Sequence, residues 1–120
     1  MTEPTESTVT RRVPVCGTSE LADGEALRVP REETGTRDAI SVFRDGDAYY
    51  ALEDTCPHAK ASLAEGWIED GEIECPLHGG RFSLCTGEAL APPATVPAVG
   101  YPVEVLDGQV WLLIQTPAPQ

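Results

Sequence analysis

The sequence has little that would suit a membrane protein or a nucleic-acid-binding protein. No run of apolar residues approaches the roughly 18 to 20 that a membrane-spanning helix needs. Basic residues are scarce, with 8 Lys and Arg against 20 Asp and Glu, and the formal net charge is -12. Such a charge repels nucleic-acid phosphates and anionic lipid headgroups. We therefore expect a soluble chain without membrane or nucleic-acid partners, whose natural partners are positively charged proteins.

The first residues, Met1 to Ser7, also lack the basic and then apolar pattern of a secretory signal, so we expect a cytoplasmic protein. A chain of 120 residues fits one domain with a modest core that needs no disulfides. Four cysteines in such a chain are more readily metal ligands or reduced thiols than disulfides. Only two histidines are present, and both lie close to a cysteine.

Asp-Gly pairs punctuate the sequence at Asp45-Gly46, Asp70-Gly71 and Asp107-Gly108. This dipeptide suits tight hairpin turns because both residues tolerate positive φ, and strand-like residues flank each pair. The predicted hairpins join residues 39–43 to 48–52, 66–69 to 72–74 and 103–106 to 109–114. No segment sustains a helical repeat over three turns, although residues 19–27 suit a short helical turn. The sequence therefore predicts an all-β domain of antiparallel sheets.

Both ends of the chain have the composition of mobile tails. Residues 1–10 are rich in Thr, Glu, Pro and Ser, and residues 116–120 read Thr-Pro-Ala-Pro-Gln. We expect a single domain over residues 11–115 between these tails. Three prolines interrupt the segment 90–97, which we interpret as a stiff loop.

Two short segments pair a cysteine with a histidine. Cys56-Pro57-His58 is followed by Cys75-Pro76-Leu77-His78. Thiolate suits zinc or the iron of sulfide clusters and imidazole suits several metals, so the ligand types alone do not choose the metal. A zinc finger usually places two cysteines in one knuckle and two histidines on a helix, whereas here each segment has one of each. Two loops of mixed ligands are what a Rieske centre needs, with two cysteines on one iron and two histidines on the other.

At these residues the sequence resembles the Rieske ferredoxin family, over roughly residues 11–115. The shared residues are Cys56-Pro57-His58, Leu63, Gly66, Cys75-Pro76-Leu77-His78-Gly79-Gly80-Arg81-Phe82, Thr86-Gly87-Glu88-Ala89-Leu90 and Pro92-Pro93. The resemblance implies a Rieske fold, in which a small cluster-binding lobe, about residues 53–88 here, is inserted into a basal β-barrel-like part. It also implies one 2Fe-2S cluster held by Cys56, His58, Cys75 and His78. The segment 90–97 would be the loop that covers the cluster.

Two departures from the respiratory-complex branch of this family concern the surroundings of the cluster. That branch links its ligand loops by a disulfide, but the corresponding residues here are Ala61 and Leu77. It also donates hydrogen bonds to sulfur from a serine and a tyrosine, at the positions of Gly80 and Phe82. Because such donors stabilise the reduced cluster, we predict a reduction potential at the low end of the Rieske range, about -150 mV.

A cluster ligated only by protein and sulfide has no open position for a substrate, so we expect a one-electron carrier and not an enzyme. By resemblance, the chain is the ferredoxin component of a ring-hydroxylating dioxygenase system of aromatic hydrocarbon catabolism. It would be monomeric, and it would take electrons from a flavin-containing, NAD(P)H-dependent reductase and pass them to a terminal oxygenase. Two alternatives stay open: the small subunit of an assimilatory nitrite reductase, and a zinc-stabilised β interaction module.

The remaining cysteines and aromatic residues have simpler interpretations. We expect Cys16 and Cys85 to pack as small apolar side chains. The aromatic residues with strand-like neighbours are expected in the core or around the cluster; they are Trp67, Phe82, Tyr101 and Trp111. Lys60 and Arg81 are the only basic side chains in the lobe, and two interpretations stay open: they help to orient a partner, or they are simply solvated.

Overall fold

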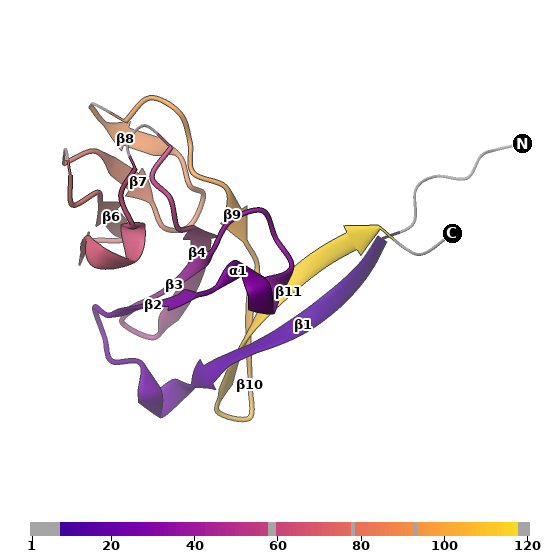
Figure 1. Cartoon of the computed structure of the whole chain (residues 1–120). Coiled ribbons are helices and arrows are strands. Elements are labelled where there is room, and N and C mark those ends of the chain that lie inside the picture. Colours follow the sequence, from indigo (N-terminus) through magenta and orange to yellow (C-terminus); the bar gives the residue numbers. More distant parts are fainter. Residues whose placement is uncertain (1–7, 58–59, 78, 93, 118–120) are drawn as a thin grey trace, which may run out of the picture.

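The protein is described by a computed structural model that covers residues 8–57, 60–77, 79–92 and 94–117. These residues form three antiparallel sheets (Figure 1). The strands are β1 (Thr8–Gly17), β2 (Ala26–Val29), β3 (Ile40–Asp45), β4 (Ala48–Glu53), β5 (Trp67–Glu69), β6 (Glu72–Glu74), β7 (Arg81–Ser83), β8 (Ala89–Ala91), β9 (Gly100–Tyr101), β10 (Val103–Leu106) and β11 (Gln109–Pro117). Helical turns are short: α1 (Arg31–Thr34), η1 (Thr18–Glu20) and η2 (Leu63–Glu65). No helix in the described ranges is long and apolar enough to cross a membrane.

The three sheets divide the molecule into a base and a lobe. The base contains a sheet with the strand order β1-β11-β10 and a second sheet with the order β2-β3-β4-β9. The lobe is a four-stranded meander, β5-β6-β7-β8, and lies at the end of the molecule away from the chain termini (Figure 1). The predicted all-β class with antiparallel sheets is thus confirmed.

The three predicted Asp-Gly hairpins are present and set the register of their strands. Asp45 pairs with Ala48 at the end of the β3–β4 hairpin. In the other two turns both residues have positive φ, 53° and 78° at Asp70 and Gly71, and 50° and 75° at Asp107 and Gly108. This backbone is the one that favours Asp-Gly at a two-residue turn, because a bulkier side chain would clash there.

Strands β3 and β4 bury both of their faces and separate two apolar cores. Alternate side chains of a strand point to opposite faces. Val42 and Ala51 accordingly join the basal core, whereas Phe43 and Leu52 join the lobe core. The other buried members of the basal core are Val13, Leu21, Val29, Ile40, Val110, Leu112 and Ile114. The other buried members of the lobe core are Cys56, Leu63, Ile73, Cys75, Phe82, Leu84, Ala94 and Ala98.

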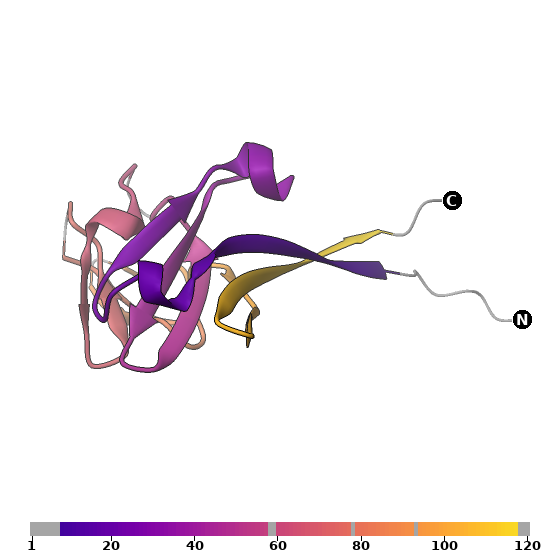
Figure 2. The same cartoon turned by 90° about the horizontal axis from the view of Figure 1, so that it is seen from below.

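Strands β1 and β11 form a long ribbon that reaches away from the lobe, as both views show (Figures 1 and 2). They pair from Gly17 and Gln109 out to Thr8 and Pro117, so the strands extend into both segments expected to be mobile tails. The expected helical turn near residues 19–27 is η1, but Ala26–Val29 is a strand. Strand β8 likewise occupies the start of the expected loop 90–97, because Ala89 and Ala91 pair with β7.

Candidate metal centre

Two of the four predicted ligands, Cys56 and Cys75, lie in the lobe core. Cys56 comes shortly after β4 and is 2% exposed, and Cys75 directly follows β6 and is fully buried. Both belong to the same group of packed apolar side chains as Phe82 and Leu63. The alternation of β6 places Ile73 and Cys75 on the buried side and Glu74 between them at the surface.

Each cysteine stands at the head of a short loop that is closed by the main chain. In the first loop, residues 54–64, the N–H of Cys56 donates to the carbonyl of Ala61 at 2.9 Å, and the N–H of Leu63 donates to the carbonyl of Asp54 at 2.8 Å. In the second loop, residues 75–80, the N–H of Cys75 donates to the carbonyl of Gly80 at 2.7 Å. These bonds set the backbone around both thiols.

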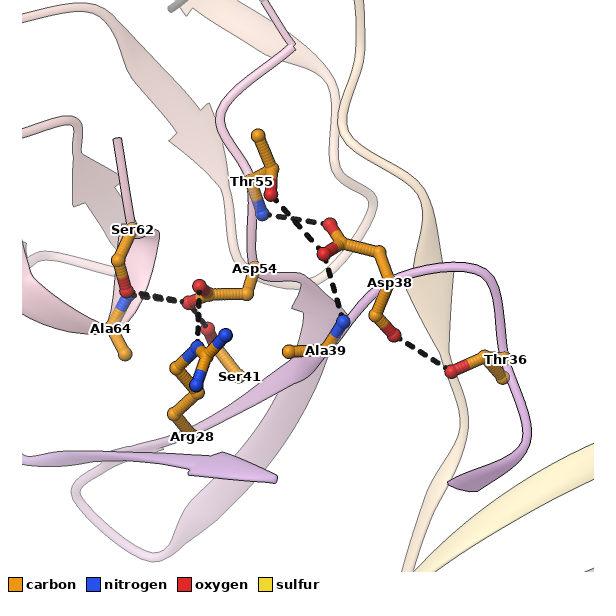
Figure 3. Close-up of polar contacts among 9 residues, drawn as sticks. All are labelled: Arg28, Thr36, Asp38, Ala39, Ser41, Asp54, Thr55, Ser62 and Ala64. Carbon is orange, nitrogen blue, oxygen red and sulfur yellow. Dashed lines mark hydrogen bonds and ion pairs between the residues drawn. The ribbon is translucent and has the colours of Figure 1, made fainter. Parts of the chain in front are cut away.

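The first loop is also held by two carboxylates that the sequence analysis did not single out (Figure 3). Asp54, which is nearly buried, accepts hydrogen bonds from Ser62 Oγ at 2.7 Å and from the N–H of Ala64 at 3.2 Å. Asp38 accepts a hydrogen bond from the N–H of Thr55 at 2.9 Å. The sequence position of Asp54, close to a predicted ligand, could have indicated such a role, because a polar residue that is buried there must find hydrogen-bond partners.

The two predicted histidine ligands, His58 and His78, lie outside the described residues. Within the described ranges, no three His, Cys, Asp or Glu side chains are grouped so as to hold a metal ion. The complete ligand set therefore stays a prediction. What the structure does show fits an iron-sulfur cluster: two buried thiols in one apolar core, each in a loop closed by a main-chain hydrogen bond, can provide thiolate donors shielded from water.

The two cysteines outside the ligand pattern differ from one another. Cys16 is half-buried against the basal core, and its burial and then the nearby Glu20 raise the pKa of its thiol. This agrees with the expected packing role. Cys85, in contrast, is exposed in the turn between β7 and β8, so the expectation that it packs as an apolar side chain is wrong. Cys85 is exposed because it lies in a surface turn and not in a strand that faces the core.

The aromatic residues also divide. Phe82 is fully buried in the lobe core, as predicted, and Tyr101 and Trp111 are half-buried. Trp67 is 60% exposed, which makes its predicted core position wrong. It lies on β5, the edge strand of the lobe sheet, opposite Glu74. Its neighbour Ile68 packs against the core instead, because alternate side chains of β5 face opposite sides.

Arg81 is not simply solvated. Its guanidinium forms ion pairs with three carboxylates across the lobe sheet, at 3.1 Å from Glu69, 3.3 Å from Glu72 and 3.1 Å from Glu74. The hydrogen bonds to Glu69 and then to Glu72 raise the pKa of Arg81. One cation thus bridges strands β5, β6 and β7 immediately after the second loop.

The fold and these two loops define a class of protein: a small all-β domain that presents one buried cysteine from each of two separate loops. The chain belongs to the Rieske [2Fe-2S] domain family, whose model matches residues 11–109. Its cofactor is therefore one 2Fe-2S cluster per chain, and not a structural zinc ion. Since such a cluster moves single electrons, the chain is an electron carrier, as predicted.

Two relatives and one solved structure are similar to this chain over most of its length. The chain is 44% identical over 98 residues to ferredoxin CarAc of Metapseudomonas resinovorans, covering 82% of this chain and 89% of that one. It is 41% identical over 102 residues to the 3-phenylpropionate/cinnamic acid dioxygenase ferredoxin subunit of Escherichia coli strain K12, covering 84% and 92%. Among solved structures, it is similar to a chain in a complex of reduced oxygenase and oxidized ferredoxin in carbazole 1,9a-dioxygenase, with a TM-score of 0.78, 44% identity and coverage of 84% and 91%.

Proposed function

We propose that this protein passes single electrons from a flavin-containing, NAD(P)H-dependent reductase to a terminal oxygenase that hydroxylates aromatic rings. The observation that supports this proposal best is the 44% identity, over most of both chains, to a chain in the complex of reduced oxygenase and oxidized ferredoxin in carbazole 1,9a-dioxygenase. We propose Cys56, His58, Cys75 and His78 as the ligands of the cluster, and residues 11–115 as one Rieske domain with its lobe at about residues 53–88. A cytoplasmic location, where NAD(P)H is available, belongs to the same proposal.

When bound, the 2Fe-2S cluster stores one electron and releases it again. The residues of the lobe core exclude water from the two thiols, because Leu63, Ile73 and Phe82 are fully buried around them. The N–H groups of Cys56 and Cys75 donate to carbonyl oxygens of their own loops, so these two donors are engaged away from sulfur. This arrangement supports a low reduction potential, because donors to sulfur stabilise the reduced cluster.

The surface charge of the lobe favours basic partners. Residues 53–88 contain eight carboxylates and two basic side chains, a formal excess of six negative charges out of the net twelve. Two of these carboxylates, Glu53 and Asp54, are largely buried and pair with Arg37 and Arg28 of the base. The accessible negative charge therefore gathers on and beside the β5–β6 hairpin, where Glu65, Glu69 and Asp70 are exposed.

Two apolar side chains of the lobe are also exposed. Trp67 is 60% exposed on β5, and Leu77 is 56% exposed in the second loop. Aromatic anchors surrounded by charged residues are common at protein interfaces. A shuttle binds its partners briefly and in turn, which suits a small contact formed by electrostatically steered encounter. We therefore propose that reductase and oxygenase compete for this side of the lobe, each presenting a basic patch around its own redox centre.

Stopped-flow kinetics with a flavin-containing ferredoxin reductase and a terminal aromatic-ring oxygenase test the proposal. The reduced protein should transfer one electron per chain to the oxygenase. Raising the salt concentration from 0.02 to 0.5 M shortens the Debye length from about 20 to about 4 Å. The second-order rate of reduction by the reductase should therefore fall clearly. A rate that does not respond to salt would contradict electrostatic steering, and a protein that the oxygenase cannot oxidise would contradict the proposed function.

A further inference from the structure

Asp54 connects the first ligand loop to the base of the molecule (Figure 3). Its carboxylate accepts hydrogen bonds from Ser62 Oγ at 2.7 Å and the N–H of Ala64 at 3.2 Å, both near the end of the loop. It also accepts a hydrogen bond from Ser41 Oγ on β3 and pairs with Arg28 Nε on β2 at 3.1 Å. One side chain thus touches two basal strands and the far end of the loop.

The main chain of Asp54 reinforces this closure. Its N–H donates to the carbonyl of Ala39 at 2.9 Å, and its carbonyl accepts the N–H of Leu63 at 2.8 Å. Asp54, the first residue of the first loop, therefore also holds the last residues of that loop in place. Because Asp54 precedes Cys56 by only two positions, any displacement of Asp54 moves the backbone that presents this cysteine.

The two charges of the Asp54–Arg28 pair lie in different surroundings. The side chain of Asp54 is 5% exposed, whereas that of Arg28 is 57% exposed. Water screens the exposed guanidinium strongly, but it screens the buried carboxylate much less. The hydrogen bonds from Ser41, Ser62 and Ala64 hold this carboxylate in place. The electrostatic potential of this pair is therefore negative on the buried side, where Asp54 lies next to the first loop.

We propose that Asp54 is a positioning residue that sets the reduction potential of the site: it holds the first ligand loop closed and keeps a buried negative charge beside Cys56. This inference rests on the proposed ligand role of Cys56. An oxidised 2Fe-2S core with two thiolates and two neutral imidazoles is formally neutral, and reduction adds one negative charge. A fixed anion nearby opposes that addition and lowers the potential.

Opposite charge changes within the pair provide the test. Asp54→Asn removes the buried anion and should raise the midpoint potential in a redox titration followed by EPR, with dithionite as the reductant. Arg28→Gln removes the exposed cation and should lower the potential, by less, because solvent screens Arg28. Glu104→Gln and Arg12→Gln make the same charge changes in an ion pair of 2.9 Å on the base, and they should leave the potential unchanged.

Ser62→Ala separates charge from loop closure, because it removes one hydrogen bond to Asp54 without changing a charge. A shift as large as that of Asp54→Asn would overturn the role proposed for the buried charge, as would shifts of the same sign in Asp54→Asn and Arg28→Gln. If Asp54→Asn fails to retain the cluster, Arg28→Gln decides: a lower potential supports the proposal and an unchanged one overturns it. A missing Rieske signal in the unsubstituted protein would instead contradict the cluster assignment itself.

Discussion

The two ligand loops are held by different means. The first loop depends on side chains from distant parts of the chain, since Asp54 joins it to Arg28 and Ser41 on the base, 26 and 13 positions away. The second loop depends on its own backbone. Its bonds run from Cys75 N–H to the Gly80 carbonyl and from Gly79 N–H to the Cys75 carbonyl, and Gly79 has a φ of 76° that favours glycine.

The two loops thus illustrate two ways of shaping one site: by side chains from distant residues, and by the backbone of the loop itself. Side-chain anchors can be changed singly, so the first loop is where substitutions can tune the electrostatic surroundings of the cluster without rebuilding the fold. A backbone turn tolerates few changes, because its hydrogen bonds are part of the main chain. The second loop instead projects from the β6–β7 hairpin of the lobe sheet, which Arg81 ties together from outside.

The largest effect is expected when a predicted ligand is removed. The result should be the same for a ligand of the first loop and for a ligand of the second loop. Cys56→Ser, Cys75→Ser, His58→Ala and His78→Ala should each lose the normal Rieske EPR and visible spectra, because the four residues complete the coordination of two irons. Cys16→Ser and Cys85→Ser are matched controls that should keep both spectra. An unaltered Rieske signal in any of the four ligand variants would show that the ligand assignment is wrong.

A smaller effect, on stability, is expected from a substitution at Gly66, where the backbone after the first loop contacts the backbone before the second loop. Gly66 follows the first loop, and a Cβ placed on it would lie 2.0 Å from the carbonyl oxygen of Glu74, the residue before Cys75. Because backbone cannot give way cheaply, Gly66→Ala should lower the free energy of unfolding by about 2 kcal/mol or more.

Gly100→Ala is the control for this substitution, because its Cβ would meet only ordinary contacts at 3.7 Å. It should change the free energy of unfolding by about 0.5 kcal/mol or less. Thermal or urea unfolding of the holoproteins measures both. Equal stability of the two variants would mean that the two loops are not coupled through Gly66.

The smallest expected effect concerns the second loop alone. Gly80 is buried, and Phe82 is fully buried in the lobe core. Because glycine and phenylalanine carry no hydroxyl, neither residue can donate one to sulfur. The double variant Gly80→Ser, Phe82→Tyr should have a higher midpoint potential than the parent, because new donors would stabilise the reduced cluster. Redox titration measures the change. A parent potential well above zero, and not near the predicted value of about -150 mV, would contradict this account.

The sequence by itself determined those features that depend on neighbours along the chain. Asp-Gly favours tight turns: both residues have positive φ at 70–71 and at 107–108, and Gly46 has positive φ in the third hairpin. The three hairpins could therefore be predicted, and with them the all-β class. The spacing of Cys56 and Cys75 relative to their histidines is equally local. Together with the residues around these ligands, it pointed to the family, and the resemblance to the family implied the cofactor.

Only the tertiary structure decided which side chains are buried and which distant residues meet. The exposure of Trp67 and Cys85 depends on their places at the edge and turn of the lobe sheet, which residue type does not reveal. Asp54 meets Arg28 because β2, β3 and β4 pair side by side and bring residues far apart in the chain to one point. Local sequence sets turns and ligand spacing, whereas contacts between separate strands exist only once the sheets have assembled and excluded water between them.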